Sequence, residues 1–221
     1  MAERTGRSAS VGPAIPPAAA SAIFGAALPT AERYATLLVR EAVERGLLGP
    51  SEAGRIWDRH LLNCAAVAPL VPAGASVIDV GSGAGLPGVV LAMLLPDSQV
   101  TLVEPMQRRV VFLEYALAEL GLGNARVVRG RAEDLAGRLA ADVVTARAVA
   151  PLARLAGLCI GLARRGGLVV ALKGASADAE LAAAADALEA LGVTDARVSE
   201  LTAKDGDTSV TVVEFTAPGR P

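Results

Sequence analysis

Short apolar runs alternate with amphipathic segments along the chain from residue 76 onward. Five runs have the length and apolar character of buried strands: SVIDV at 76–80, QVTLVE at 99–104, ARVVR at 125–129, DVVTA at 142–146 and LVVAL at 168–172. The spacing of apolar residues predicts helices between and after them, at 87–95, 107–120, 133–139, 151–164 and 177–191. Strands that alternate with helices of this length predict a parallel sheet covered by helices on both faces.

The two ends of the chain depart from this alternation. Apolar residues at helical spacing predict helices over 31–42 and 51–67, separated by Gly49-Pro50. At the other end, the runs 196–201 and 209–216 flank a polar turn, so they predict a hairpin whose last strand is antiparallel to its neighbour. The expected fold class is therefore α/β, in the plan of the class I S-adenosylmethionine-dependent methyltransferases: a Rossmann-like, mostly parallel seven-stranded sheet with an antiparallel terminal hairpin, preceded by N-terminal helices.

Composition supports one folded domain with an irregular beginning. The chain has 221 residues, of which 52% are hydrophobic and 20% charged. Prolines at 13, 16 and 17 interrupt the apolar stretch near the start, which argues against a signal peptide. Two distant cysteines without a disulfide framework fit a reducing cytosol, so we expect a cytoplasmic protein. We therefore predict a disordered tail over 1–23, a helical segment packed on the core over 24–73, and the methyltransferase domain over 74–217.

Charge and rare residues limit the possible partners. The formal net charge is -2, so binding of nucleic acid requires a local basic patch, which Arg55, Arg59, Arg108 and Arg109 could form. Two distant cysteines and a single histidine give neither a disulfide framework nor a histidine-rich metal site. The expectation is a monomer without a metal or a membrane span.

The segment from Asp79 to Gly88 is the strongest candidate for a ligand site. It directly follows a predicted strand and opens a predicted helix, and its glycines let the backbone turn sharply and approach a ligand. Glu104 ends the next strand, where neighbouring strand ends meet, and its carboxylate can accept both hydroxyls of an adenosine ribose. The predicted cofactor-binding residues in the turn are Asp79, Gly81, Ser82, Gly83, Gly85 and Leu86.

The same glycines leave a second interpretation open. Gly83, Gly85 and Gly88 satisfy the G-x-G-x-x-G pattern of dinucleotide-binding proteins. An acidic residue two places before the first glycine and the terminal hairpin favour S-adenosylmethionine instead. In the loop 130–134, a backbone N–H and the carboxylate of Glu133 or Asp134 could bind the adenine, or these acids could simply favour the following helix.

Two further residues are candidates for substrate chemistry. Arg147 follows the fourth strand and so faces the crevice at the strand ends, where it could bind a phosphate or a base carbonyl. The alternative is a surface arginine. The acidic, proline and aromatic motif that often serves methylation of exocyclic amines is absent from this position. His60 is the only histidine, and a purely structural role for it is the alternative.

Several short motifs occur together in one order: WDRHLLN at 57–63, GLPG at 85–88, Arg108-Arg109 with Phe112-Leu113, GRAE at 130–133, ARA at 146–148 and ALKG at 171–174. With them, the chain resembles the bacterial 16S rRNA (guanine-N7) methyltransferases, the RsmG/GidB family, over roughly residues 30–215. The resemblance implies transfer of a methyl group from S-adenosyl-L-methionine to N7 of a guanine in 16S rRNA, on the naked RNA or in the 30S particle.

The resemblance also implies roles for individual residues. Ala132, Glu133 and Arg147 match positions that the family uses around the cofactor, together with Gly81, Gly83 and Glu104. The implied catalytic residues are Arg147, His60 and Lys173, and the expected RNA-binding residues are Arg59, His60, Arg108, Arg109 and Lys173. Guanine N7 has a lone pair and no proton, so such an enzyme needs positioning rather than a general base. A small-molecule methyltransferase and a non-catalytic adenosine-binding regulator remain the alternatives.

Overall fold

A single seven-stranded sheet organises the chain. The computed structural model describes residues 15–42, 46–47 and 49–218. The sheet order is β3-β2-β1-β4-β5-β7-β6. The strands are β1 (Ser76–Val80), β2 (Gln99–Glu104), β3 (Ala125–Arg129), β4 (Ala141–Arg147), β5 (Ala163–Leu172), β6 (Arg197–Thr202) and β7 (Ser209–Thr216).

The pairing of these strands confirms the predicted strand plan. β1 lies between β2 and β4 and is parallel to both, while β3 and β5 extend the parallel part on either side. β7 is antiparallel to both β5 and β6, as a terminal hairpin requires. The order reverses at β1, between β2 and β4, and this switch point places a crevice at the carboxyl ends of the strands.

Helices cover both faces of the sheet. They are α4 (Gly88–Leu94), α5 (Gln107–Leu120), α6 (Ala132–Leu135), α7 (Leu152–Ile160), α8 (Ala177–Ala183) and α9 (Ala185–Ala190). The helix expected over 151–164 ends at Ile160 because β5 begins at Ala163 and pairs there with Ala141. The helix expected over 133–139 is a single turn, and the one expected over 177–191 is divided in two.

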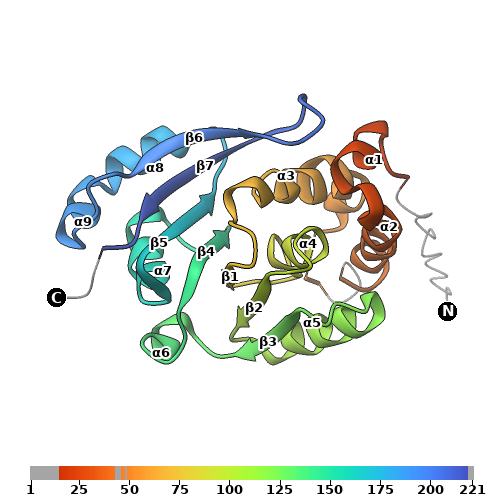
Figure 1. The fold of residues 1–221 in the computed structure, drawn as a ribbon, viewed down its shortest axis with the longest axis horizontal. Coiled ribbons are helices and arrows are strands. Elements are labelled where there is room, and N and C mark those ends of the chain that lie inside the picture. The colour runs from red at the N-terminus through yellow and green to blue at the C-terminus, as the bar shows by residue number, and fades with distance from the viewer. Residues whose placement is uncertain (1–14, 43–45, 48, 219–221) are drawn as a thin grey trace, which may run out of the picture.

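Residues that alternate along each strand serve two separate cores. Val77 belongs to the core formed with α4, α5 and the N-terminal helices, whereas Ile78 and Val80 belong to the core formed with α7, α8 and α9. Figure 1 shows the N-terminal helices gathered beside α4 and α5, on the opposite side of the sheet from α7. Burial on both faces explains why the central strands are continuous apolar runs.

The N-terminal segment is helical throughout most of its described length. Its elements are α1 (Ala18–Phe24), η1 (Gly25–Ala27), α2 (Leu28–Leu37), the π-helical η2 (Leu38–Ala42), η3 (Pro50–Arg55), the π-helical η4 (Ile56–Leu61), α3 (Leu62–Ala65) and η5 (Ala68–Leu70). The helix α1 begins inside the region where composition predicts a disordered tail, and its Ala20, Ile23 and Phe24 are buried. Residues 1–14 of that predicted tail lie outside the described residues.

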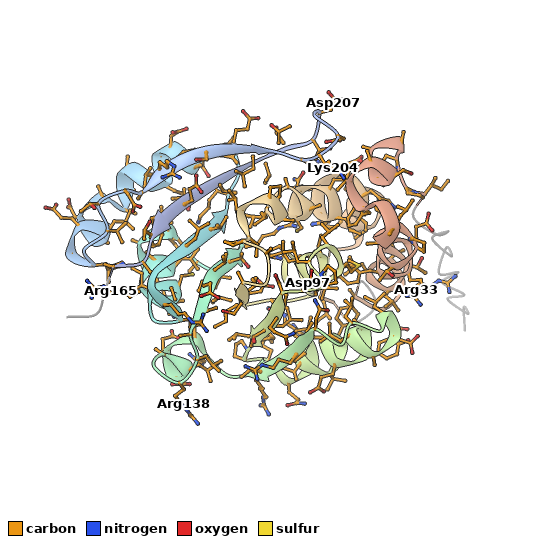
Figure 2. All side chains as sticks on the ribbon, viewed as in Figure 1. Arg33, Asp97, Arg138, Arg165, Lys204 and Asp207 are labelled. Carbon is orange, nitrogen blue, oxygen red and sulfur yellow. The ribbon has the colours of Figure 1, made fainter. Side chains whose placement is uncertain are left out.

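Charged side chains are concentrated at the periphery of the fold. Figure 2 shows Lys204 and Asp207 at the turn of the terminal hairpin and Arg138 beside α6, at the opposite side of the view. Arg138 precedes β4, so it lies at the amino end of the strand that carries Arg147 at its carboxyl end. Within the described residues, no helix is long and apolar enough to cross a membrane.

Candidate active site

The glycine-rich turn links β1 to α4 at the switch point of the sheet. Gly81, Gly83 and Gly85 have φ angles of 67°, 60° and 99°, in the left-handed region that favours glycine. The amides of Gly81 and Ser82 both donate to the carbonyl oxygen of Val103, which fixes the turn against the end of β2. The turn therefore presents backbone rather than side chains to the crevice.

Asp79, a buried residue at the start of this turn, stabilises it through hydrogen bonds. Its Oδ2 accepts the amide of Gly88 at 3.0 Å, and its Oδ1 accepts the Thr145 hydroxyl at 3.4 Å. A Cβ on Gly88 would lie 2.7 Å from Asp79 Oδ2, so only glycine allows this contact. Burial raises the pKa of Asp79 to about 7. Asp79 is thus a support of the turn, and it does not line either of the two cavities described next.

Tyr34, which sequence reasoning missed, connects the N-terminal helices to the turn. Its hydroxyl donates to the carbonyl oxygen of Ala84 at 2.7 Å, and the side chain is fully buried. A Cβ on Gly85 would come within 2.7 Å of this hydroxyl. The helical segment therefore fixes the ligand turn as well as adding to the core.

One cavity lies at the carboxyl ends of β1 and β2 and is called the β2 cavity. It has a volume of about 340 Å³. Four predicted cofactor-binding residues line it: Gly81, Glu104, Ala132 and Glu133. Ser82, Gly83, Gly85 and Leu86 shape the adjoining turn instead. The remaining lining includes the apolar side chains of Val103, Met106 and Leu158.

Glu104 forms the polar floor of the β2 cavity. Its buried carboxylate accepts the amides of Gly83 at 3.0 Å and Met106 at 2.9 Å, and Arg109 Nη1 lies 3.5 Å from it. An ionised carboxylate has about four lone-pair sites, so acceptor capacity remains for hydroxyl groups. Arg109 lines the same cavity, and its buried Nε has no partner among the described residues. The donor and acceptor set, flanked by apolar side chains, fits a nucleoside with a flat base and vicinal hydroxyls.

A larger cavity of about 780 Å³ lies at the carboxyl ends of β4 and β5 and is called the β4 cavity. Arg59, Arg147 and Lys173 line it, with Glu180 as the one acidic residue. Lys173 Nζ lies 2.6 Å from Glu180 Oε2, and this hydrogen bond lowers the pKa of Glu180. Arg59 lies 3.6 Å from Glu52, an acid outside the lining. The lining itself carries three cations and one acid, a net positive charge that suits an anionic ligand.

The guanidinium of Arg147 is held in place by hydrogen bonds to His60 and Cys64. Its Nη2 donates to His60 Nδ1, and its Nη1 donates to the Cys64 sulfur at 3.4 Å. His60 is only 5% exposed and does not line the cavity, although the sequence predicted that it contacts RNA. Burial, and then the charge of Arg147, lower the pKa of His60, so its ring is neutral at pH 7.

The two cavities meet at the loop that follows Arg147. Ala148, Val149 and Ala150 line both of them. Ala148 has a φ of 54°, an uncommon conformation for a residue other than glycine, and a Cβ on Gly81 would meet the Val149 side chain at 2.7 Å. A group bound in one cavity is therefore adjacent to a ligand bound in the other.

The predicted site residues divide between the two cavities. Arg147 and Lys173 line the β4 cavity together with Arg59, which the sequence had grouped with Arg108 and Arg109. Arg147 was also expected around the cofactor, but it does not line the β2 cavity, whereas Arg109 does and Arg108 is exposed on α5. No cluster of three His, Cys, Asp or Glu side chains that could hold a metal ion occurs in the described part of the chain.

The family model and the similar proteins that match this chain carry the same description. A family model described as "GidB: rRNA small subunit methyltransferase G" matches residues 27–210. The ribosomal RNA small subunit methyltransferase G of Salinispora tropica is 54% identical over 215 residues, covering 92% of this chain and 89% of that protein. The protein of the same name from Thermobifida fusca is 58% identical, covering 76% of this chain and 70% of its own.

Solved structures with a similar fold are methyltransferases. An S-adenosylmethionine-dependent methyltransferase from Aquifex aeolicus superposes with a TM-score of 0.56 at 15% identity, covering 84% of this chain and 97% of that chain. An S-adenosylmethionine-dependent O-methyltransferase from Thermotoga maritima gives 0.57 at 16% identity, covering 72% and 65%. These likenesses confirm the predicted fold class.

Proposed function

The chain belongs to the rRNA small subunit methyltransferase G family, and on that basis we propose that it transfers a methyl group from S-adenosyl-L-methionine to N7 of a guanine in 16S rRNA. The observation that carries this proposal is the pair of adjoining cavities. One is lined by the buried carboxylate of Glu104 and by apolar side chains, with Arg109, Arg131 and Arg154 also in the lining, and the other is lined by three cations and a single acid. A nucleoside cofactor and an RNA nucleotide need these two environments side by side.

The β2 cavity is the proposed cofactor site. With S-adenosylmethionine bound, Glu104 would accept the ribose hydroxyls, and Val103, Met106 and Leu158, which line this cavity, would pack against the adenine. The turn at Gly81 lets the backbone approach the amino-acid part of the ligand. When bound, the cofactor supplies a methyl group activated by its positively charged sulfur. Glu104 and the apolar side chains of the lining would orient the bound cofactor.

The β4 cavity is the proposed guanine site. Guanine N7 attacks with its lone pair and loses no proton, so the reaction needs no general base. The acid of the lining, Glu180, is already paired with Lys173 and is not needed for deprotonation. Arg147 and Lys173 donate to the O6 edge and to a phosphate of the RNA. Contacts to oxygen leave the ring face free of opposing charge as the base becomes positive.

Several finer points extend this proposal. The open, cationic β4 cavity has little to enclose a small metabolite and suits a large anionic substrate, either naked 16S rRNA or the 30S particle. Arg59 and Arg108 would contact the RNA outside the reacting base. We further propose that the protein acts as a monomer in the cytoplasm, where its substrate is assembled.

Methyl transfer by the purified chain tests the proposal. The chain is incubated with methyl-labelled S-adenosylmethionine and either 30S particles or 16S rRNA that lack the modification, and the product nucleoside is identified by mass. We expect 7-methylguanosine, and a loss of about 100-fold or more in Arg147→Ala with cofactor affinity retained. Arg138→Ala, which removes an exposed arginine at the amino end of β4, is the matched control. Label in a different nucleoside, or full activity of Arg147→Ala, would contradict the proposal.

A further inference from the structure

Glu52 contacts His60, which in turn contacts Arg147 of the proposed guanine site. Its Oε2 is 2.7 Å from His60 Nε2, and the other ring nitrogen, Nδ1, accepts a hydrogen bond from Arg147 Nη2. Glu52 belongs to η3, His60 to η4 and Arg147 to the end of β4, so three separate elements converge on one line of contacts.

The donors and acceptors along this line allow only one arrangement of protons. A guanidinium group has N–H donors and no acceptor, so His60 Nδ1 must offer its lone pair to Arg147. Because Nδ1 must be the acceptor, the proton of the ring is on Nε2, and that N–H donates to the Glu52 carboxylate. The hydrogen bond with His60 lowers the pKa of Glu52, which keeps it ionised as an acceptor.

This arrangement matters because a long arginine side chain has many rotamers. Arg147 is partly buried and lines the β4 cavity, where a shift of its guanidinium would misalign any nucleotide that it contacts. Two acceptors, His60 Nδ1 and the Cys64 sulfur, fix its position. If His60 carried its proton on Nδ1, that nitrogen would be a donor facing the N–H of Arg147. The stronger of the two hydrogen bonds that hold the guanidinium would then be lost.

We propose that Glu52 is a positioning residue for the methyl transfer: by binding the Nε2–H of His60, it selects the tautomer whose Nδ1 accepts from Arg147 and so fixes the guanidinium in the guanine site. This inference rests on the proposed function only for the identity of the reaction. The hydrogen-bond pattern itself is a property of the protein alone.

An alternative role for Glu52 makes a different prediction. Glu52 Oε1 also lies 3.6 Å from Arg59 Nη1, whose side chain is 51% exposed. If Glu52 acted only by partly neutralising the charge of Arg59, its removal would change the affinity for RNA and leave the His60 tautomer unchanged.

Three charged groups act on the pKa of His60: Glu52 from η3, Arg59 from the same element as His60, and Arg147 from β4.

The single histidine of the chain makes the tautomer directly measurable. A long-range ¹H–¹⁵N correlation spectrum of the ¹⁵N-labelled chain, prepared without a histidine tag, contains the ring nitrogens of His60 alone. We expect the pure Nε2–H form in the wild type and a mixture of tautomers in Glu52→Ala. Glu52→Gln keeps an amide oxygen as acceptor and should restore the Nε2–H form.

Kinetics of the same variants give the functional readout. Glu52→Ala should lower kcat about 10-fold or more, with KM for RNA and for S-adenosylmethionine within about twofold, and Glu52→Gln should recover most of this loss. The matched control is Asp58→Asn, since Asp58 is exposed on η4 and makes no polar contact among the described residues. It should change neither spectrum nor rate.

The pH profile separates positioning from simple structural support. Protonation of His60 removes the acceptor for Arg147, so activity falls as the pH decreases through the pKa of His60. The Glu52 carboxylate raises that pKa, so both Glu52→Gln and Glu52→Ala should move the acid limb to lower pH. The Gln variant keeps the side-chain shape and so tests the shift even if the Ala variant folds poorly.

Three results would overturn this inference. They are an Nδ1–H tautomer in the wild type, an unchanged tautomer and kcat in Glu52→Ala, or a change confined to KM for RNA. A wild-type chain that methylates no RNA would refute the proposed function, and with it the role in catalysis. That failure is distinguishable because the ring spectrum is recorded without substrate and still reports the tautomer.

Discussion

Asp79 gives the sharpest stability prediction because it is an acid buried beneath the ligand turn. Its pKa is raised to about 7 in the folded chain by burial. An unfolded chain restores the ordinary value of about 3.9. The folded state therefore binds the proton more tightly, and this contribution to stability is full below about pH 4 and is lost as the pH rises through 7.

The size of the effect follows from the shift. Each pKa unit corresponds to about 1.4 kcal/mol, so a shift of about 3 units costs the folded state about 4 kcal/mol once Asp79 is ionised. Of this, about 2–3 kcal/mol is lost between pH 5 and pH 7. Asp79→Asn has no carboxyl to ionise, and its side-chain oxygen can still accept the Gly88 amide that Asp79 accepts at 3.0 Å.

Urea unfolding of both chains at pH 5, 6, 7 and 8 measures this difference. We expect the free energy of unfolding of the wild type to fall relative to that of Asp79→Asn by about 2–3 kcal/mol from pH 5 to pH 7, and then to level off. Acids with lowered pKa values, such as Asp142, are common to both chains and cancel in the difference. A difference constant to within about 0.5 kcal/mol across this range would refute the reasoning.

Three further substitutions test the site. Glu104→Gln should weaken binding of S-adenosylmethionine about 10- to 100-fold by calorimetry, since the ribose loses a charged acceptor; unchanged affinity would remove Glu104 from the cofactor site. Gly88→Ala places a Cβ 2.7 Å from Asp79 Oδ2 and should lower the free energy of unfolding, measured by thermal unfolding, by about 1–3 kcal/mol. The control is Gly157→Ala, whose Cβ would meet no atom within 4 Å and should not lower it. Tyr34→Phe removes the hydroxyl that donates to Ala84 at 2.7 Å and should cost about 1–3 kcal/mol; a smaller loss would mean that water satisfies the carbonyl.

Periodicity predicted the central strands β1, β2 and β4 because they are buried on both faces, and it also predicted the edge strand β3, which has no fully buried residue. The bounds of β2, β3 and α5 match the runs at 99–104, 125–129 and 107–120. The helix expected over 151–164 was too long because Leu162 and Ala163 continue its apolar pattern, although Ala163 begins β5. Only the pairing of Ala163 with Ala141, a residue remote in sequence, decides whether Ala163 is in a helix or a strand.

The positions of two candidate site residues were predictable because each is the last residue of a strand. Glu104 and Arg147 end β2 and β4, so their positions at the crevice follow from topology alone. Glu52 and Tyr34 come from helices that precede the sheet, and no local pattern shows which strand end those helices cover. The neutral state of His60 also needed the structure, because burial and the nearness of Arg147 determine it.

The activity proposed for this chain is methylation of N7 of a guanine in 16S rRNA, with Arg147 in the active site. It can be tested by mass mapping of 16S rRNA from cells with and without the gene, with the deletion strain complemented by the wild type or by Arg147→Ala. We predict one 7-methylguanosine that disappears on deletion, returns with the wild type, and stays absent or strongly reduced with Arg147→Ala. A 7-methylguanosine that persists in the deletion strain, or returns in full with Arg147→Ala, would contradict the account.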